Sequence, residues 1–189
     1  RTFPVIDETA RGNAAQMLTQ AKSPTLSERE AKRLLAVYGV PVVSDVLVTH
    51  AHEAIAAAAQ AGYPLVLKIE SPDLPHKSDV GGVRLNIRSQ EDLLREMDEM
   101  TRVVRTAAPT ARIDGVLVQP MVGNGVEIIV GAKLDPQFGP LLVVGLGGVF
   151  VDLLDDVRVA PVPVSREQAH QMLTDLRGAK TLQGARGLP

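Results

Sequence analysis

The stretch PLVLKIESPDLPHKSDVGGVRLNI, residues 64–87, contains two apolar runs that are separated by a charged loop. Each run has the length and composition of a β-strand. The first run carries one internal cation, Lys68, and the loop places HKSD directly before a Gly-Gly pair. A loop of this composition is compatible with a phosphate site, a metal site or a simple turn, and the rest of the chain has to decide between them.

Lys68 is the first candidate functional residue. Period-two alternation puts Leu65, Leu67 and Ile69 on one face of the strand and Lys68 on the other face. The structural alternative is a surface lysine whose stem packs along apolar neighbours. The loop that follows favours a phosphate site, because it offers another lysine and backbone amides that we expect glycines 81 and 82 to leave free. The motif GxxxxGK[ST] is absent, which excludes a P-loop NTPase, and GLGG at 145–148 is a weak signal alone.

Composition excludes several classes of protein. The 189 residues include no cysteine, so disulfides, thiolate zinc sites and cysteine nucleophiles are impossible. A net charge of −2 argues against nucleic acid as a partner. No apolar run reaches the roughly 20 residues of a membrane span, and no signal peptide is visible, so we expect no membrane partner and a cytoplasmic location. Because the chain starts at Arg1 and stops at Leu188-Pro189 without a closing element, we expect it to be a piece of a longer protein.

The pattern along the chain predicts an α+β fold of two lobes. Helix and strand alternate first, and a strand-rich block with the turn signals Gly123-Asn124-Gly125 and Asp135-Pro136 follows, which favours antiparallel pairing. Capping-box spacing marks helix starts at Ser27 and Ser165. The expected helices are 27–39, 50–62, 89–108 and 165–177, and the expected strands are 40–48, 64–70, 82–87, 114–122, 125–134 and 139–154.

A resemblance makes this reading specific. The strings EAKRLLAVYGVPV, GYPLVLKIESPDLPHKSDVGGVRL, VLVQPMV and GVEIIVGAKLDPQFGPLLVVGLGGVFVDLL are similar to the ATP-grasp domain of NDP-forming acyl-CoA synthetases, a family related to succinyl-CoA synthetase. The similarity covers residues 27–187. It implies an ATP-grasp fold with the nucleotide bound between two lobes. The implied boundaries are a polar linker over 1–24, an ATP-grasp domain over 25–189 with an inserted lobe at about 42–112, a hinge at 116–122, a second lobe over 113–189, and a truncated C-terminal end.

The resemblance also implies roles for individual residues. Lys68 would contact the nucleotide phosphates, and the loop 77–82 would close over them. The hinge would read adenine through backbone groups, with Met121 packing on the base, and Glu127 would contact the ribose. Asp152 would bind Mg²⁺, with Asp156 as a second acidic ligand, and carboxylates suit this ion. The implied nucleotide-binding residues are Lys68, Ser78, Asp79, Val80, Gly81, Gly82, Gln119, Pro120, Met121, Val122 and Glu127, and the catalytic ones are His76, Lys77 and Asp156.

Two positions depart from the family pattern. Asp152 stands where the family usually has glutamate, which shortens the metal-binding arm by one methylene. An arginine that often follows the metal acids aligns with Ala160, while Arg158 lies two residues earlier on the same face of an expected strand. Either Arg158 substitutes for that arginine or the charge is lost.

The implied function is the phosphoryl-transfer half of an acyl-CoA synthetase that uses ATP or ADP with Mg²⁺. The reaction is acid + CoA + ATP ⇌ acyl-CoA + ADP + phosphate, through a phosphohistidine on a partner domain. We expect CoA-binding and CoA-ligase domains, in the same polypeptide or another, to bind CoA and the carboxylic acid or acyl-CoA, and an oligomer is possible. The alternatives are a regulatory domain of a protein lysine acetyltransferase without turnover, and a carboxylate–amine ligase, against which the HKSDVGG string argues.

His76 has two readings. The structural one is a loop histidine that is hydrogen-bonded to backbone. The functional one, which the resemblance favours, is an imidazole beside Lys77 that either receives the phosphoryl group and passes it to ADP or only orients it, because a covalent relay divides a long transfer into shorter ones.

Overall fold

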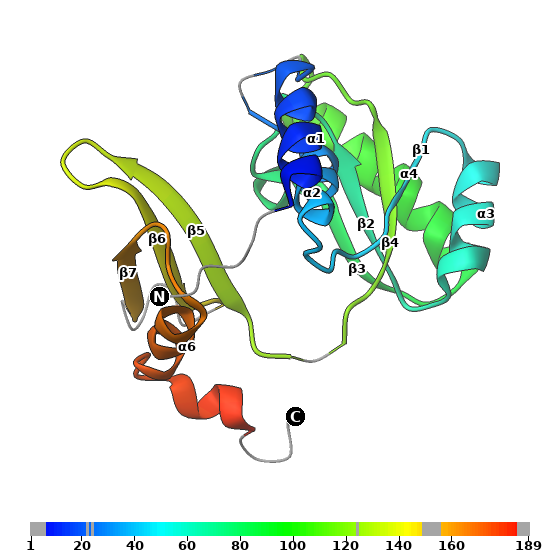
Figure 1. Ribbon diagram of the computed structural model, residues 1–189. Coiled ribbons are helices and arrows are strands. Elements are labelled where there is room, and N and C mark those ends of the chain that lie inside the picture. The colour runs from blue at the N-terminus through cyan, green and yellow to red at the C-terminus, as the bar shows by residue number, and fades with distance from the viewer. Residues whose placement is uncertain (1–6, 22, 24, 124, 149–155, 185–189) are drawn as a thin grey trace. The chain divides into compact units, whose positions relative to one another are not determined.

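A computed structural model describes residues 7–184 of the chain, apart from residues 22, 24, 124 and 149–155 (Figure 1). The described residues divide into two compact units, with residues 7–122 in the first unit and residues 123–184 in the second. Both units contain helices and an antiparallel sheet, which confirms the predicted α+β class.

The first unit is built on a four-stranded sheet in the order β1-β4-β2-β3, in which every neighbouring pair is antiparallel. Figure 1 shows β2 inside this sheet, between β4 and β3. The elements of this unit are α1 (Glu8–Thr19), α2 (Glu28–Val37), β1 (Val46–Val48), α3 (Ala51–Ala61), β2 (Leu65–Glu70), the 3₁₀ helix η1 (Lys77–Val80), β3 (Val83–Ile87), α4 (Gln90–Ala107) and β4 (Gly115–Pro120).

The core of this unit lies on one face of the sheet. Leu65, Leu67 and Ile69 alternate along β2 and are fully buried, together with apolar residues from β1, β3, β4, α3 and α4. Helices α3 and α4 therefore cover the apolar face that the period-two pattern of β2 predicted. Val66 and Glu70, on the other face of β2, are also buried, so both faces of this strand are covered.

The start of α2 has the predicted capping box. The Ser27 hydroxyl accepts a hydrogen bond from the backbone N–H of Glu30, and the Glu30 carboxylate accepts one from the backbone N–H of Ser27. This exchange satisfies two N–H groups that a helix start leaves without intrahelical partners. It also fixes the residue between them, Glu28, in the first turn of α2.

The second unit contains a three-stranded antiparallel sheet in the order β5-β6-β7. The hairpin of β5 (Ile128–Asp135) and β6 (Gly139–Leu146) turns at Asp135-Pro136, as the sequence predicted. The Asp135 carboxylate accepts hydrogen bonds from the backbone N–H groups of Gln137 and Phe138, which stabilises this turn. The remaining elements are β7 (Val157–Pro161), α6 (Arg166–Thr174) and the 3₁₀ helix η2 (Ala179–Gln183).

The predicted linker contains a helix that the sequence pattern did not reveal. Helix α1 begins after Asp7, whose carboxylate accepts a hydrogen bond from the backbone N–H of Thr9, and it buries Ala10 and Ala14. Alanine is small, so two buried alanines give only a weak apolar periodicity, although alanine has the highest helix propensity. The expected polar linker over residues 1–24 therefore contains a helix at residues 8–19.

Strand β4 also lies in a different unit from the one expected. Residues 113–122 were assigned to the second lobe, yet β4 pairs with β2 over its whole length and with β1 over Val116–Val118. Residues 116–120 of the predicted hinge are thus strand in the first unit. The pattern of β4 shows that it is a strand, but it contains no information on which distant strand it pairs with.

Candidate functional site

A pocket of about 680 Å³ opens in the first unit beside the charged loop. Its lining comes from four places in the chain: the start of α2, Lys68 of β2, the loop that runs from Ser71 into η1, and Val83 of β3. Five of the predicted site residues line it together, namely Lys68, His76, Lys77, Ser78 and Asp79. The first unit therefore brings the strand lysine and the charged loop to one cavity.

The register of β2 against β4 positions two polar side chains on the same face of the sheet. Val66 lies opposite Gln119, and Lys68 lies opposite Leu117. Residues directly opposite in an antiparallel pair share a face. Lys68 and Gln119 therefore both project away from the apolar core, and both reach the same carboxylate, that of Glu28.

Glu28 is the centre of this polar cluster, although no sequence pattern singled it out. Its Oε1 accepts hydrogen bonds from Lys68 Nζ at 2.7 Å and from Gln119 Nε2 at 3.2 Å, and it lies 3.0 Å from Lys32 Nζ. Its Oε2 lies 3.7 Å from Lys77 Nζ. One carboxylate thus contacts three lysines and one amide.

Lys77 lies between two carboxylates. Its Nζ is 3.7 Å from Glu28 Oε2 and 3.7 Å from Glu70 Oε2, and its side chain is only 11% exposed. Glu70 Oε2 is buried and accepts no hydrogen bond from the described residues. A buried polar atom without a hydrogen bond is destabilising, so the distance to Lys77 leaves this carboxylate incompletely satisfied.

The environment of Glu28 stabilises its charged form. Burial alone would raise the pKa of Glu28, but hydrogen bonds from Lys68, Lys32 and Gln119 outweigh burial and lower the pKa from 4.5 to about 2. The carboxylate is therefore ionised at neutral pH. A lowered pKa in the folded state means that the charged contacts stabilise the fold above the pKa of the unfolded chain.

This lowered pKa leads to a prediction about stability. Replacing Glu28 with glutamine is expected to lower the melting temperature at pH 7, because the charged hydrogen bonds are lost. The difference from wild type is expected to shrink as the pH falls from about 4.5 toward 2, because protonation removes the same charge from the wild type. Thermal unfolding followed by circular dichroism at several pH values measures this. A difference that stays constant down to pH 2 would contradict the assignment.

The loop after Pro75 forms a compact turn around η1. Gly81 has φ of +70°, which favours glycine, and a Cβ on Gly82 would lie 2.9 Å from the Lys77 carbonyl oxygen. The backbone N–H of Gly82 donates to Lys77 O at 2.7 Å, and that of Gly81 donates to Ser78 O at 3.1 Å. The expectation of free glycine amides was wrong for this structure, because both glycines close the turn.

His76 lies immediately before η1 with an exposed side chain that lines the pocket. Its backbone carbonyl accepts a hydrogen bond from Asp79 N at 3.2 Å. Among the described residues, no hydrogen bond holds its imidazole. The structural reading predicted a side chain bonded to backbone, and this contact is not found there.

The other residues predicted to bind nucleotide in the first unit lie outside the pocket lining. Val80, Gly81 and Gly82 belong to the turn behind the pocket, and Gln119 reaches the cluster only through Glu28. At the end of β4, the backbone N–H of Met121 donates to Pro64 O at 2.9 Å. Pro120 ends the strand, and Val122 is exposed. Their roles stay predictions.

The second unit holds Glu127 and Asp156 at separate positions. Glu127 lies against a glycine pair: its carbonyl accepts a hydrogen bond from Gly147 N at 2.7 Å, and a Cβ on Gly147 would lie 2.8 Å from Glu127 Cβ. A side chain at position 147 of the GLGG string would clash with Glu127, which is a structural reason for glycine there. The ribose role of Glu127 stays a prediction.

Asp156 is buried and anchors the backbone after α6. Its two oxygens accept hydrogen bonds from Arg177 N and Gly178 N, both at 2.9 Å, and Arg158 Nη1 lies 3.5 Å from Oδ1. Burial raises the pKa of Asp156, but these donors outweigh burial and hold the pKa below its ordinary value. Arg158 also donates to the carbonyl of Asp175, so its side chain is engaged within this unit.

The predicted metal site is not assembled by the described part of the chain. Asp152 lies outside the described residues, and both oxygens of Asp156 already accept backbone hydrogen bonds. Within the described ranges, no group of three or more histidine or acidic side chains is placed to hold a metal ion. The described donors therefore do not fit Mg²⁺ by themselves, and the assignment to Asp152 and Asp156 stays a prediction.

In the described ranges of the chain, no helix is long and apolar enough to cross a membrane.

Comparison with known proteins places this chain in a family. A family model described as an ATP-grasp domain matches residues 17–189. The chain is 40% identical to the β subunit of acetate–CoA ligase [ADP-forming] II from Pyrococcus furiosus, over 91% of this chain and 72% of the relative. It is 45% identical to acetate–CoA ligase [ADP-forming] I from Archaeoglobus fulgidus, over 84% of this chain and 23% of the relative. The chain thus spans most of a β subunit but about a quarter of the longer ligase.

Solved structures agree with this comparison. The dinucleotide forming acetyl-coenzyme A synthetase 1 of Ca. Korarchaeum cryptofilum, in complex with coenzyme A and Ca-AMPCP, matches with a TM-score of 0.86 at 40% identity, over 95% of this chain and 78% of that chain. The same protein with Mg-AMPPCP, its phosphohistidine segment pointing towards the nucleotide binding site, matches with a TM-score of 0.77 at 39% identity, over 93% of this chain and 76% of that chain. Lys68 of the sheet and residues 76–79 of the HKSDVGG loop line one pocket, and by its sequence this chain belongs to the ATP-grasp domain family, in the group that includes the ADP-forming acetate–CoA ligases.

Proposed function

We propose that the chain is the nucleotide-binding, phosphoryl-transferring part of an ADP-forming acyl-CoA synthetase. The observation that carries this proposal is the convergence of Lys68 and Lys77 on one anionic group, in a pocket of about 680 Å³ that His76 also lines. Two ammonium groups directed at one oxygen-bearing group match the requirement of a site that holds phosphate oxygens.

The chemistry of the pocket is positioning and neutralisation of charge. Phosphoryl transfer needs little covalent chemistry from the protein, because alignment and stabilisation of the phosphate oxygens supply most of the catalysis. Lys68 is held by the buried strand β2, and Lys77 by η1. In this proposal both lysines bind oxygens of the terminal phosphates of ADP or ATP. Magnesium, when bound with the nucleotide, would neutralise further phosphate charge.

His76 is placed for a relay in this proposal. In this relay, a neutral imidazole nitrogen of His76 attacks the phosphorus of a partner phosphohistidine whose other ring nitrogen is protonated. One P–N bond forms as the other breaks, the partner histidine leaves as neutral imidazole, and His76 becomes the protonated phosphohistidine. A terminal phosphate oxygen of ADP then attacks the same phosphorus, which forms ATP and frees His76. The exposure of His76 in the pocket wall, without a hydrogen bond to its imidazole among the described residues, supports this role.

Strand β4, whose end is predicted to read adenine, is paired with β1 over only part of its length. Strand β1 pairs with β4 only as far as Val118, whereas β2 pairs with it to Pro120. Beyond Val118, that edge of β4 has no strand partner among the described residues. In this proposal, the backbone of residues 119–122 reads the base, with the exception of the Met121 N–H, which already binds Pro64.

The partners follow from the lengths of the relatives. The relative from Pyrococcus furiosus is named as a subunit, and the one from Archaeoglobus fulgidus is about four times as long as the matched segment. We propose that CoA and the carboxylic acid bind to further domains of such an assembly, and that this chain handles the nucleotide. The relatives named above are CoA ligases or synthetases, which does not favour the alternative of a regulatory acetyltransferase domain.

A reconstitution experiment tests this division of labour. The 189-residue chain alone is expected to form no acyl-CoA from acetate, ATP and CoA, because the proposed CoA and acid sites lie on other domains. Adding the CoA-binding and CoA-ligase domains of an ADP-forming acyl-CoA synthetase is expected to produce acyl-CoA and ADP, which chromatography quantifies. Those domains alone serve as the control. Formation of acyl-CoA by this chain alone would contradict the proposal. The proposal would also be contradicted if the chain and the added domains demonstrably form a complex that makes no acyl-CoA.

A further inference from the structure

The cations of the proposed phosphate site already hold an anion that belongs to the chain. Lys68 Nζ donates to Glu28 Oε1 at 2.7 Å, and among the described residues Glu28 is its only ion-pair partner. The same carboxylate lies 3.7 Å from Lys77 Nζ. Its two oxygens therefore take the contacts that phosphate oxygens would need.

Glu28 lowers the positive charge around the pocket. The four cations Arg29, Lys32, Lys68 and Lys77 face three carboxylates: Glu28, Glu70, and Asp45, which pairs with Lys32 at 3.1 Å and with Arg29 at 3.6 Å. A cluster with less net positive charge attracts an incoming anion more weakly. Withdrawal of Glu28 adds one uncompensated positive charge beside Lys68 and Lys77, which line the pocket.

The lysines do not depend on Glu28 for their positions. Lys68 belongs to a strand with hydrogen-bonded neighbours on both sides and buried residues before and after it. Lys77 begins η1 and contacts Glu70 independently of Glu28. Glu28 instead belongs to α2, none of whose residues is buried in the described structure. Lys68 is thus held by the sheet and Lys77 by η1, whereas the anion is held by a helix with no buried residue among those described.

We propose that Glu28 is an internal competitor of the nucleotide: its carboxylate occupies a phosphate position, and nucleotide binding exchanges it for phosphate oxygens. This inference rests on the proposed function, because it names a further residue of the same site. In this proposal the Glu28 side chain rotates away from Lys68 and Lys77 when the phosphate binds. The contacts that stabilise the nucleotide-free chain are the ones that oppose the ligand.

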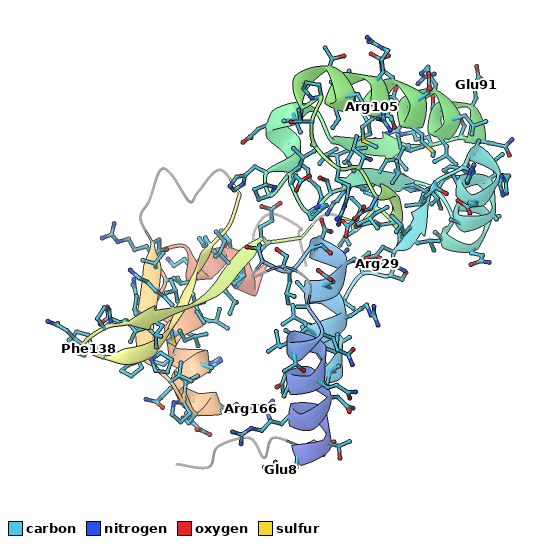
Figure 2. All side chains as sticks on the ribbon, turned by 90° about the horizontal axis from the view of Figure 1, so that it is seen from above. Glu8, Arg29, Glu91, Arg105, Phe138 and Arg166 are labelled. Atoms are coloured by element: carbon cyan, nitrogen blue, oxygen red, sulfur yellow. The ribbon has the colours of Figure 1, made fainter. Side chains whose placement is uncertain are left out.

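The test compares nucleotide affinities of matched variants. Glu28→Gln removes the competing charge and keeps the size of the side chain, so it is expected to bind Mg-ADP about tenfold more tightly than wild type in calorimetry, since one charge-assisted contact no longer has to be broken. Glu91→Gln is the control. Glu91 is likewise in the first turn of a helix, it is exposed, and Figure 2 shows it on α4, well away from Arg29 in α2. The affinity of the Glu91→Gln variant for Mg-ADP is expected to equal that of wild type.

Two further measurements isolate the mechanism. Adenosine has no phosphate, so its affinity is expected to be the same in wild type and Glu28→Gln. In a Lys68→Ala background, Glu28→Gln is expected to raise the ADP affinity by less than about threefold, because the cation that it would free is absent. A gain that is equally large for adenosine, or that persists without Lys68, overturns the exchange mechanism.

The remaining outcomes separate this inference from the function on which it rests. If wild type binds ADP and a folded Glu28→Gln binds no more tightly, the competitor role is wrong and the proposed function stands. If neither binds ADP at millimolar concentration, the nucleotide site and this inference both fall. Glu28→Asp keeps the charge but shortens the arm by one methylene, and it is expected to show a smaller gain than glutamine. It provides the same comparison if the glutamine variant does not fold, and weaker binding by folded Glu28→Asp overturns the proposal.

Discussion

Replacing His76 with asparagine is expected to reduce ATP formation by the assembled synthetase at least about 100-fold, because removal of a nucleophile or proton-transfer group has effects of this size or larger. Asparagine can still donate and accept hydrogen bonds, but it lacks the nucleophilic imidazole nitrogen. The side chain is exposed and lies before η1, so the turn of residues 77–82 is expected to remain intact. Affinity for ADP is therefore expected to change by no more than about twofold.

The measurement follows labelled phosphate through the reaction. The complete enzyme is loaded with acyl-CoA and labelled phosphate, ADP is added, and acid-labile phosphoprotein is compared with labelled ATP. In the variant, label is expected to accumulate on the partner histidine. His52→Asn, an exposed histidine of α3, is the control and is expected to behave as wild type. A His76→Asn enzyme that forms ATP at a near wild-type rate would reduce His76 to a loop residue, and loss of ADP affinity would show that His76 holds the shape of the loop.

Replacing Lys68 with alanine is expected to weaken binding of Mg-ADP or Mg-ATP by about 1.5–3 kcal/mol, which is roughly a 10- to 150-fold change in the dissociation constant. The variant loses an ammonium group that lines the pocket from a fixed strand. If Glu28 competes for this lysine, the loss in the wild-type background is expected near the lower end of that range and is larger in the Glu28→Gln background.

Calorimetry of the 189-residue chain measures this loss directly. Lys133→Ala is the matched control, because Lys133 is an exposed strand lysine of β5 in the second unit. Its nucleotide affinity is expected to equal that of wild type. Equal affinities for Lys68→Ala and Lys133→Ala would contradict the placement of the phosphates at Lys68. A thermal unfolding transition of Lys68→Ala well above the assay temperature would show that the variant is folded during the comparison.

Local patterns predicted most of the elements of the fold. The capping boxes at Ser27 and Ser165, the alternation in β2 and the turn at Asp135-Pro136 all appear in the structure where the sequence indicated them. These features depend on residues within a few positions of one another, so a single sequence is sufficient to recognise them. The two pocket lysines were found in the same way, from a strand that carries a cation and leads into a charged glycine loop.

What the sequence by itself determined is the identity of these elements, the polar face of β2 and the HKSDVGG loop, because each depends on neighbouring residues. The tertiary structure decided the rest: that β4 pairs with β2 and so places Gln119 beside Lys68, and that α2 brings Glu28 onto the lysines. Glu28 is 40 residues from Lys68 and 91 from Gln119 along the chain. No local periodicity encodes contacts over such separations. These contacts form only when the strands have paired in their final register and α2 has packed beside the sheet.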